Sequence, residues 1–326
     1  MEKFPKHVLS SDQFSPEMIE YLCGQAEDIR AIMETGKKRQ LLGKLHGMSM
    51  FTVFYEPSTR TRFSFEQAGN VCGMHKCSTE NAEITSSVSK GENLEDTVKT
   101  LSGYYPDVFV LRHKVKGAAK RAAEVIDEKK KNVHIINAGD GKGEHPSQAL
   151  LDFYTIWQAK GRKLDNIRIM FGGDLKYGRT VRSLARVLAK YPGITMTFVA
   201  PEALQVAEDI RADLDTHQIP YTLESDPMKA FPEADVIYWT RLQKERIEDE
   251  RTRIELEEIE RKGTYNIGSP QLSVMKPTAN ILHPLPRVGE ILHEVDQDPR
   301  SWYFTQAENG LYIRIALLLE LLRESE

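Results

Sequence analysis

The sequence predicts an α/β protein of two doubly wound domains, each a parallel sheet flanked by helices. At 326 residues the chain exceeds the size at which one hydrophobic core usually keeps growing. Short apolar runs alternate with segments of helical spacing, which is typical of a parallel sheet covered on both faces. The alternation then continues through the second half of the chain. We expect a first domain over residues 1–150 and a second over 151–305, with a C-terminal helix, 306–326, packed back on the first.

The first domain opens with an amphipathic helix. Ser15 is suited to cap this helix and Pro16 to occupy its first position, and apolar residues then recur at helical spacing from Met18 to Met33. Buried strands are predicted at three apolar runs: 48–55, 107–111 and 133–136. Helical spacing between them predicts helices at 94–102 and 118–126.

The second domain follows a linking helix predicted at 148–159. Its predicted elements are strands at 167–171, 195–199, 235–239 and 279–282 and a helix at 180–190. The segment Gly310–Arg323 is apolar on every side of its helical wheel, so it must be buried, and we expect it to cross back to the first domain. The charged stretch 243–262 has two open interpretations, a mobile loop over a site or a solvated helix face.

Composition and charge narrow the classes of partner. The chain is 40% hydrophobic and 28% charged, with a net charge of -4 and a pI near 6.2. That balance argues against nucleic acid or an anionic membrane as a partner, although local basic pockets remain compatible with it. No apolar run is long enough to cross a bilayer, and the first ten residues lack the apolar core of a signal peptide.

The three cysteines, Cys23, Cys72 and Cys77, suit a reducing cytoplasm, where we expect the protein. Cys72 and Cys77 flank His75 and could form half of a metal site. No second Cys/His pair with ligand spacing follows, which favours ordinary thiols.

Polar and cationic residues follow five of the predicted strands. In open α/β sheets, ligands bind beyond the carboxyl ends of the strands. The segments that occupy this place are 56–62, 112–113, 145–148, 240–244 and 283–287. We therefore expect them to line one cleft between the two domains.

The first of these segments, 56–62, is suited to a phosphate. A helix N-terminus presents unpaired N–H groups and a partial positive charge to an anion. Ser58, Thr59 and Thr61 add hydroxyl donors, and Arg60 can grip two phosphate oxygens. Taken alone, the segment also fits a simpler interpretation, in which Ser58 or Thr59 caps the helix and the arginines are solvated.

Two nucleotide-binding motifs are excluded. The chain has no Gly-x4-Gly-Lys-Ser/Thr stretch, as a P-loop requires. Gly172-Gly173-Asp174 follows a predicted strand, but the Gly-x-Gly-x-x-Gly spacing is missing, which argues against a dinucleotide-binding dehydrogenase.

His145 and Gln148 stand three residues apart at the start of a predicted helix, so their side chains can face one ligand. A helix N-terminus tends to keep an imidazole neutral and able to donate to a carbonyl oxygen. A lone histidine more often has a structural role. The pair therefore indicates a binding site only in combination with the other strand-end segments.

Together these motifs resemble the aspartate and ornithine carbamoyltransferase family. Phe54-Tyr-Glu-Pro-Ser-Thr-Arg-Thr-Arg-Phe63 resembles its carbamoyl phosphate signature, Ser-x-Arg-Thr. His145-Pro-x-Gln148 resembles the second shared motif of the family. The similarity extends from Leu42 to the C-terminal helix.

Three further segments resemble the family members that use aspartate. They are Gly173-Asp-Leu-Lys-Tyr-Gly-Arg179-Thr, Arg241-x-Gln243-Lys-Glu-Arg and His283-Pro-Leu-Pro286-Arg. Members that use ornithine carry His-Cys-Leu-Pro in the last segment, and their Ser-Met-Gly motif is missing here. Aspartate brings two carboxylates and calls for arginines in the second domain, whereas a cationic amine would call for acidic groups.

The resemblance implies a role for each matching residue. The phosphate would be held by Ser58, Thr59, Arg60 and Thr61. The carbamoyl carbonyl would be polarised by Thr61, Arg112 and His145, with Gln148 near the amide. The aspartate carboxylates would be bound by Arg179, Arg241 and Gln243 and by backbone at Pro284 and Leu285.

The resemblance also implies a homotrimer with active sites shared between subunits. In this family a Ser and a Lys reach in from the neighbouring subunit, and they match Ser86, preferred to Ser87, and Lys90. Glu56 is expected to orient the arginines. At Gly289 the family pattern calls for an acidic residue, which puts a local salt bridge in doubt. Whether a separate regulatory chain binds is left open.

The expected reaction is attack by the neutral amine of L-aspartate on the carbamoyl carbon. It would yield N-carbamoyl-L-aspartate and phosphate, a step of pyrimidine biosynthesis. Thr61, Arg112 and His145 would hold the oxyanion of a tetrahedral intermediate, and such donors supply about 3–4 kcal/mol each. The leaving phosphate can accept the proton, so the reaction requires no metal, nucleotide, cofactor or covalent nucleophile, and domain closure would exclude water.

Two alternatives remain at this stage. One is a sister enzyme that carbamoylates ornithine, putrescine or an acylated ornithine, against which the second-domain arginines argue. The other is an inactive homologue that serves as a scaffold or regulatory subunit. Every matched site position is intact, which argues against the scaffold.

Overall fold

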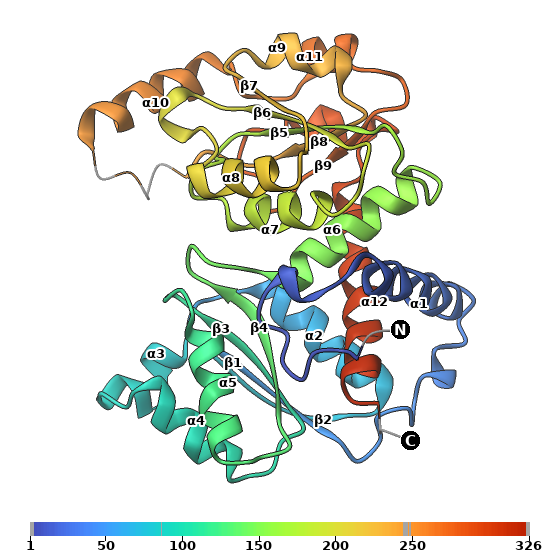
Figure 1. Cartoon of the computed structure of the whole chain (residues 1–326), viewed down its shortest axis with the longest axis vertical. Coiled ribbons are helices and arrows are strands. Elements are labelled where there is room, and N and C mark those ends of the chain that lie inside the picture. Colours follow the sequence, from blue (N-terminus) through green and yellow to red (C-terminus); the bar gives the residue numbers. More distant parts are fainter. Residues whose placement is uncertain (1–2, 86, 244–246, 248, 324–326) are drawn as a thin grey trace. The chain divides into compact units, whose positions relative to one another are not determined.

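The structure, a computed structural model, describes residues 3–85, 87–243, 247 and 249–323 (Figure 1). The chain divides into two compact units: unit 1 is Met1–Leu151 with Glu308–Glu326, and unit 2 is Asp152–Ala307. The chain passes from unit 1 to unit 2 within α6 (Pro146–Ala159) and returns within α12 (Tyr303–Leu321). The predicted fold, two parallel sheets flanked by helices, is confirmed.

Four strands form the sheet in the described part of unit 1. Their order is β2 (His75–Glu80), β1 (Ser49–Phe54), β3 (Val108–His113) and β4 (His134–Asp140), and all pairs are parallel. The chain leaves β1 toward β2 and then returns to β3 on the other side of β1. The strand order thus reverses between β1 and β3, where α/β sheets bind ligands beyond the carboxyl ends of their strands.

Helices cover both faces of this sheet. On one face, α4 (Leu94–Ser102) and α5 (Ala118–Glu128) pack their apolar sides onto Val53 and Phe109 of the sheet. Figure 1 shows α1 (Pro16–Glu34), α2 (Thr59–Cys72) and α12 on the other side of the sheet. The first turn of α1 has the predicted cap, since Ser15 Oγ accepts the Met18 N–H at 3.4 Å.

Helix α12 is buried, as its apolar composition predicts. Ile313, Ile315 and Leu317 are fully buried. The guanidinium of Arg314 lies 5.0 Å from the ring centre of Phe65 in α2, and near the C-terminus Glu320 accepts the Tyr21 hydroxyl of α1 at 3.1 Å. Residues from the end of the chain therefore complete the core of unit 1.

The described residues of unit 2 form a related parallel sheet with five strands. The strand order is β7 (Tyr221–Glu224), β6 (Thr195–Val199), β5 (Arg168–Gly172), β8 (Val236–Trp239) and β9 (Asn280–Leu282), all parallel. The order reverses between β5 and β8. The helices are α7 (Arg179–Leu188), α8 (Glu208–Thr216), α9 (Pro227–Ala230), α10 (Glu250–Lys262) and α11 (Ser269–Val274).

The remaining short elements in the described part of the chain are α3 (Ala82–Thr85) and several 3-10 helices of three to five residues. These are η1 (Ser11–Gln13), η2 (Lys38–Gln40), η3 (Ser87–Lys90), η4 (Glu202–Leu204), η5 (Phe231–Glu233) and η7 (His293–Gln297). In the part of the chain that the structure describes, no helix is both long and apolar enough to span a membrane.

Two strands, β2 and β7, have no counterpart in the prediction. Both are edge strands, and both lack the continuous apolar run on which the other predictions rest. The charged stretch 243–262 contains α10, in which Leu256 is the buried residue, so the solvated helix face is the correct interpretation for 250–262. Residues 244–246 and 248 lie outside the described residues.

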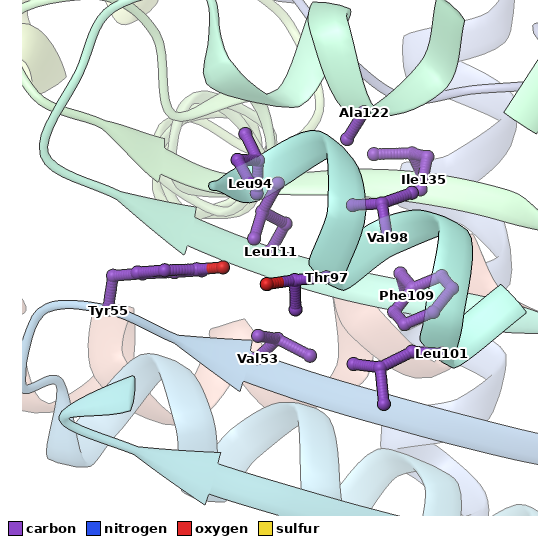
Figure 2. Close-up of a pocket in the computed structure, with 10 residues that line it drawn as sticks. All are labelled: Val53, Tyr55, Leu94, Thr97, Val98, Leu101, Phe109, Leu111, Ala122 and Ile135. Carbon is purple, nitrogen blue, oxygen red and sulfur yellow. The ribbon is translucent and has the colours of Figure 1, made fainter. Parts of the chain in front are cut away.

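A cavity in the unit 1 core, shown in Figure 2, is too small for a substrate. Its volume is about 10 Å³, enough for one water molecule, and its lining is almost entirely apolar. The Tyr55 hydroxyl points toward Thr97 there, and burial raises the pKa of Tyr55. In unit 2 a wider groove of about 570 Å³ contains Arg168 and Thr195, the first residues of β5 and β6. Both are at the amino ends of their strands, opposite the end where ligands bind.

Candidate active site

The phosphate-binding segment of unit 1 connects β1 to α2, at the point where the strand order reverses. Ser58 is the N-cap residue of α2, with extended backbone angles of φ -160° and ψ 91°, but its side chain makes no capping hydrogen bond. Its N–H donates to Glu80 Oε1 at 3.1 Å. The simpler interpretation, in which Ser58 only caps the helix, is therefore wrong for its hydroxyl. Thr59 is the first residue of α2 and is exposed.

The two arginines of this segment differ in their surroundings. Arg62 Nη2 lies 2.9 Å from Glu80 Oε2, and its Nη1 lies 3.4 Å from Glu66 Oε1. Arg60 forms no ion pair with any residue in the described ranges. Although Arg60 is exposed overall, desolvation lowers the pKa of its guanidinium, which is the condition of a cation suited to an incoming anion.

Thr61 and His145 meet in the interior of unit 1. Thr61 Oγ1 and His145 Nε2 lie 3.4 Å apart, and both residues are buried. The His145 carbonyl accepts the N–H groups of Gln148 at 2.9 Å and Ala149 at 3.1 Å, so His145 stands at the N-terminus of α6, as predicted. Gln148 is half-buried in the first turn of that helix.

Arg112 comes from β3, the strand beside β1. Its Nη1 donates to the Ala138 carbonyl at 3.2 Å, and its Nη2 lies 3.6 Å from Glu56 Oε2. Glu56 therefore contacts one of the arginines that it was expected to orient. The three predicted carbonyl-polarising residues thus come from neighbouring strands: Arg112 lies near the carboxyl end of β3, while Thr61 and His145 follow β1 and β4.

Asp140 is a residue of this site region that sequence reasoning missed. It ends β4 and is buried, and its carboxylate accepts the Glu144 N–H at 2.6 Å and the Gly117 N–H at 2.7 Å. Gly141 has φ +59°, and a Cβ there would lie 2.0 Å from the Lys114 carbonyl oxygen. These contacts fix the turn that leads into His145. The Asp-Gly-Lys-Gly sequence was a signal for such a turn.

The residues expected to enter a neighbouring site are the least described. Lys90 ends η3 and is exposed. Ser86 lies outside the described residues, and only the backbone of Ser87 is described. The preference for Ser86 stays a prediction.

In unit 2 the Gly172-Gly173 pair serves packing. A Cβ on Gly172 would lie 2.0 Å from the Trp239 ring, and a Cβ on Gly173, whose φ is +101°, would lie 2.0 Å from the Thr240 carbonyl oxygen. Thr240 Oγ1 donates to the Gly172 carbonyl at 3.0 Å and accepts the Asp174 N–H at 3.0 Å. Because the two glycines have no side chain, the ends of β5 and β8 can pack closely against each other. This packing role agrees with the rejection of a dinucleotide-binding turn.

The predicted carboxylate-binding residues follow these two joined strands. Arg179 is the first residue of α7, after β5, while Arg241 and Gln243 follow β8. All three are half-buried. Because β5 and β8 pair in parallel, the segments after them leave the same edge of the sheet.

Pro284 and Leu285 follow β9 and are half-buried. Leu285 has φ +54°, a left-handed conformation that is uncommon outside glycine and that clusters at functional sites. Arg287 has a structural role. Its Nη2 donates to Asp296 Oδ2 at 2.6 Å, and this hydrogen bond raises the pKa of Arg287.

The doubt attached to Gly289 is resolved by its neighbour. Glu290 accepts the N–H groups of Val288 at 2.9 Å and Gly289 at 3.1 Å, and its Oε1 lies 2.8 Å from His283 Nε2. Burial opposes the ionisation of Glu290, but the hydrogen bond from His283 outweighs it together with the backbone donors, and the pKa of Glu290 is lowered. A carboxylate therefore orders this segment from position 290.

The cysteines near His75 are not assembled around it. Burial raises the pKa of Cys72 to about 12, while Cys77 is exposed, and all three cysteines are free. No cluster of three or more His, Cys, Asp or Glu side chains in the described ranges could hold a metal ion.

Comparison with known proteins identifies the family. Residues 6–158 match the carbamoyl phosphate-binding domain of the aspartate/ornithine carbamoyltransferases, and residues 165–321 match their Asp/Orn-binding domain. The chain belongs to the aspartate/ornithine carbamoyltransferase family. The predicted resemblance is thereby confirmed, and each of the two family domains coincides with one parallel sheet.

Several members of this family are similar to the chain over nearly its whole length. The chloroplastic aspartate carbamoyltransferase of Arabidopsis thaliana is 45% identical over 315 residues, which cover 97% of this chain and 77% of the relative. The aspartate carbamoyltransferase catalytic subunit of Vibrio campbellii is 41% identical over 322 residues, which cover 99% and 98%.

Solved structures of carbamoyltransferases agree in fold. The catalytic subunit of M. jannaschii aspartate transcarbamoylase superposes with a TM-score of 0.87 at 40% identity and covers 99% of this chain and 100% of its own. Aspartate transcarbamoylase from Trypanosoma cruzi, in complex with N-(phosphonacetyl)-L-aspartic acid, also gives 0.87, at 35% identity, and covers 98% and 96%. The same enzyme has been solved in complex with carbamoyl phosphate and aspartate.

Proposed function

We propose that this chain transfers the carbamoyl group of carbamoyl phosphate to the amino group of L-aspartate. The phosphate half of this proposal rests on unit 1. The N-terminus of α2 offers backbone donors at the point where the strand order reverses, and Arg60 stands beside it without an ion-pair partner among the described residues. Thr61, Arg112 and His145 lie at or beyond the carboxyl ends of neighbouring strands and supply donors for a carbonyl oxygen.

The observation that carries the choice of amine is the pair of arginines in unit 2. Arg179 and Arg241 follow β5 and β8, the two strands between which the order reverses. Two guanidinium groups suit a substrate with two carboxylates and would repel a diamine. The relatives named as aspartate carbamoyltransferases, and the complexes with aspartate and its phosphonacetyl derivative, support the same choice.

The proposed step balances without a further reactant. The amine nitrogen forms a bond to the carbamoyl carbon, and the bond from that carbon to the phosphate oxygen breaks. Phosphate leaves with the electron pair of the broken bond and accepts the proton that the amine loses. The protein contributes orientation of the two substrates and hydrogen-bond donors to the oxyanion, and both lower the barrier to acyl transfer.

Product analysis tests this proposal. The purified chain is incubated with carbamoyl phosphate and, in separate reactions, with aspartate, ornithine or putrescine, and the products are identified by mass. We expect carbamoyl-aspartate alone. A carbamoylated ornithine or putrescine would keep the phosphate site and overturn the assignment of Arg179, Arg241 and Gln243, whereas no product from any amine would favour the inactive scaffold.

We also propose a homotrimer with shared active sites, located in the cytoplasm and supplying pyrimidine biosynthesis. Unit 1 exposes large apolar side chains, among them Phe63, Ile84 and Tyr105, which suits an interface. Free cysteines suit a reducing compartment. Mixing Lys90→Ala with Arg60→Ala protein tests the shared site, since mixed trimers would regain part of the activity. No recovery would count against a site built across subunits.

A further inference from the structure

A buried carboxylate lies in unit 2 beneath the predicted aspartate-binding segments. Asp152 is fully buried within α6. Its Oδ2 accepts the Tyr238 hydroxyl at 2.7 Å, and its Oδ1 accepts a hydrogen bond from Gln306 Nε2 at 2.5 Å. None of these three residues was singled out from the sequence. A buried charge is costly unless it is hydrogen-bonded, so its presence in the interior calls for an explanation.

The hydrogen bonds of Gln306 have a fixed direction. A carboxylate can only accept, so the amide nitrogen of Gln306 must face Asp152, and its oxygen faces the other way. That oxygen accepts the backbone N–H of His283 at 2.8 Å. Asp152 thereby sets the orientation of the amide that holds the first residue after β9.

The His283 ring continues this chain of hydrogen bonds to Leu285. Its Nδ1 accepts the Leu285 N–H at 2.8 Å, so the ring proton is on Nε2, which lies 2.8 Å from Glu290 Oε1. These bonds hold the backbone of Leu285 in its disfavoured left-handed conformation. The sequence of contacts therefore runs from Asp152 through Gln306 and His283 to Leu285.

A second series of contacts starts from the same carboxylate. The Tyr238 hydroxyl, which donates to Asp152, also interacts with the side chain of Thr180. Thr180 follows Arg179 in the first turn of α7. Asp152 is thus connected to two of the three segments that are predicted to bind the amine substrate.

We propose that Asp152 and Gln306 are positioning residues, whose hydrogen bonds hold the Pro284–Leu285 backbone in the conformation that binds the dicarboxylate substrate. This inference rests on the proposed function. It differs from a purely structural role in one respect. Substrate affinity depends on which partner donates and which accepts in the hydrogen bonds from Asp152 to Leu285. The number of hydrogen bonds and the packing alone do not determine it.

Reversing the direction of one hydrogen bond tests the proposal. Gln306→Glu places a second carboxylate against Asp152, so we expect at least a 10-fold rise in KM for aspartate, with KM for carbamoyl phosphate changed less than 2-fold. In the double variant D152N/Q306E the new amide can donate to the new carboxylate, which still accepts the His283 N–H. The total charge is unchanged, and we expect KM for aspartate to return to within 3-fold of wild type.

Tyr265→Phe is the matched control. It removes another hydroxyl hydrogen bond of unit 2, the 2.6 Å bond to the Ser225 carbonyl, which has no connection to Leu285. We expect it to lower thermal stability without changing KM for aspartate. If Q306E leaves KM for aspartate unchanged, if the double variant is no better than Q306E, or if Y265F raises KM to the same extent, the proposal is overturned.

Two additional measurements keep the outcome interpretable. Should Q306E fail to fold, Gln306→Met removes both side-chain hydrogen bonds of Gln306, to Asp152 and to His283, without adding charge, and we expect about a 5-fold rise in KM for aspartate. An unchanged KM would refute the proposal. Binding of succinate, a dicarboxylate without an amine, is measured by calorimetry in the presence of carbamoyl phosphate. This affinity is expected to fall with the same variants, and it reports on positioning even if the wild-type chain makes no carbamoyl-aspartate.

Discussion

The predicted phosphate side in unit 1 and the predicted aspartate side in unit 2 both lie where the strand order of a parallel sheet reverses, but they hold their functional groups differently. In unit 1 the predicted phosphate-binding side chains lie in one short segment, 58–61, and Thr61 of that segment contacts His145 directly. In unit 2 the corresponding segments are held in place by residues that are not themselves predicted to contact the substrate. Gly173 packs on the Thr240 carbonyl, and Asp152 fixes Gln306 and, through it, the segment after β9.

The difference teaches where each half is sensitive to change. A phosphate is recognised by donors and charge, which a short loop at a helix N-terminus provides by itself. A two-carboxylate substrate must be oriented at both ends, so the segments that carry its ligands need a rigid support. Substitution of an exposed side chain should therefore affect function in unit 1, whereas substitution of buried backbone contacts should affect stability and substrate affinity in unit 2.

The largest effect is expected from Arg60→Ala, which tests the unit 1 half of the comparison. Loss of a charge-assisted phosphate contact should lower kcat/KM about 10³-fold, or about 4 kcal/mol, with little change in the melting temperature. Arg62→Ala is the matched control. Because Arg62 is engaged with Glu66 and Glu80, its loss should lower the melting temperature and reduce kcat/KM less than about 10-fold. Equal activity losses in the two variants would show that Arg60 has no special role.

A smaller effect, on stability, is expected from Gly173→Ala in unit 2. The added Cβ would meet the Thr240 carbonyl oxygen at 2.0 Å with φ at +101°, so we expect a loss of about 3 kcal/mol in the free energy of unfolding, measured in urea. Gly161 also has a positive φ, +63°, but nothing lies within 4 Å of the position that a Cβ would take there, so Gly161→Ala should cost about 1 kcal/mol. Similar losses in both variants would mean that the contact with Thr240 contributes no rigidity.

The smallest effect is expected at His7. This residue lies outside the predicted binding segments of both units, so its substitution shows the size of effect to expect away from them. Burial lowers the pKa of His7 below 6.5, although Asp127 opposes this shift, and its Nδ1 accepts the Ile135 N–H at 3.0 Å. Its contribution to stability is therefore fully present above pH 6.5 and is lost as the pH falls through the lowered pKa. Nearby His134 also has a lowered pKa, and its titration is common to wild type and to a variant of His7.

His7→Asn keeps an acceptor for the Ile135 N–H but removes the titration. We expect the variant to lose less stability than wild type between pH 7 and pH 5.5, by no more than about 1.4 kcal/mol, the equivalent of one pKa unit. The comparison is made from urea midpoints at each pH. Parallel curves for the two proteins would exclude His7 as a contributor.

The sequence predicted what depends on contiguous patterns. Buried strands such as β6 follow from runs of neighbouring residues, and the phosphate segment is a run as well, although α2 begins at Thr59, earlier than the start near Phe63 that its sequence predicts. The edge strands β2 and β7 were missed, because a strand exposed on one side and unpaired on the other carries no long apolar run. Their formation depends on pairing with β1 and β6, which local sequence does not contain.

The support of the unit 2 site could not be predicted for a similar reason. Asp152 and Gln306 are far from each other in the sequence, and neither stands out in its own segment, so nothing connected them to His283. Gly172 and Gly173 were visible, but the reason for them is the close approach of Trp239 and Thr240, which is a property of the paired strands. Contacts between distant segments become readable only once the register of the sheet is known.

The burial of α12 in unit 1 has a consequence for the order in which the protein is made. Unit 2 is an uninterrupted stretch of chain, whereas unit 1 needs the segment that begins at Glu308. During synthesis unit 1 therefore begins first but is completed last. The contacts of Tyr21 with Glu320 and of Phe65 with Arg314 can form only after all of unit 2 has been synthesised. A ribosome-bound chain truncated after Ala307 should contain a complete unit 2 and an incomplete unit 1 that still exposes apolar surface.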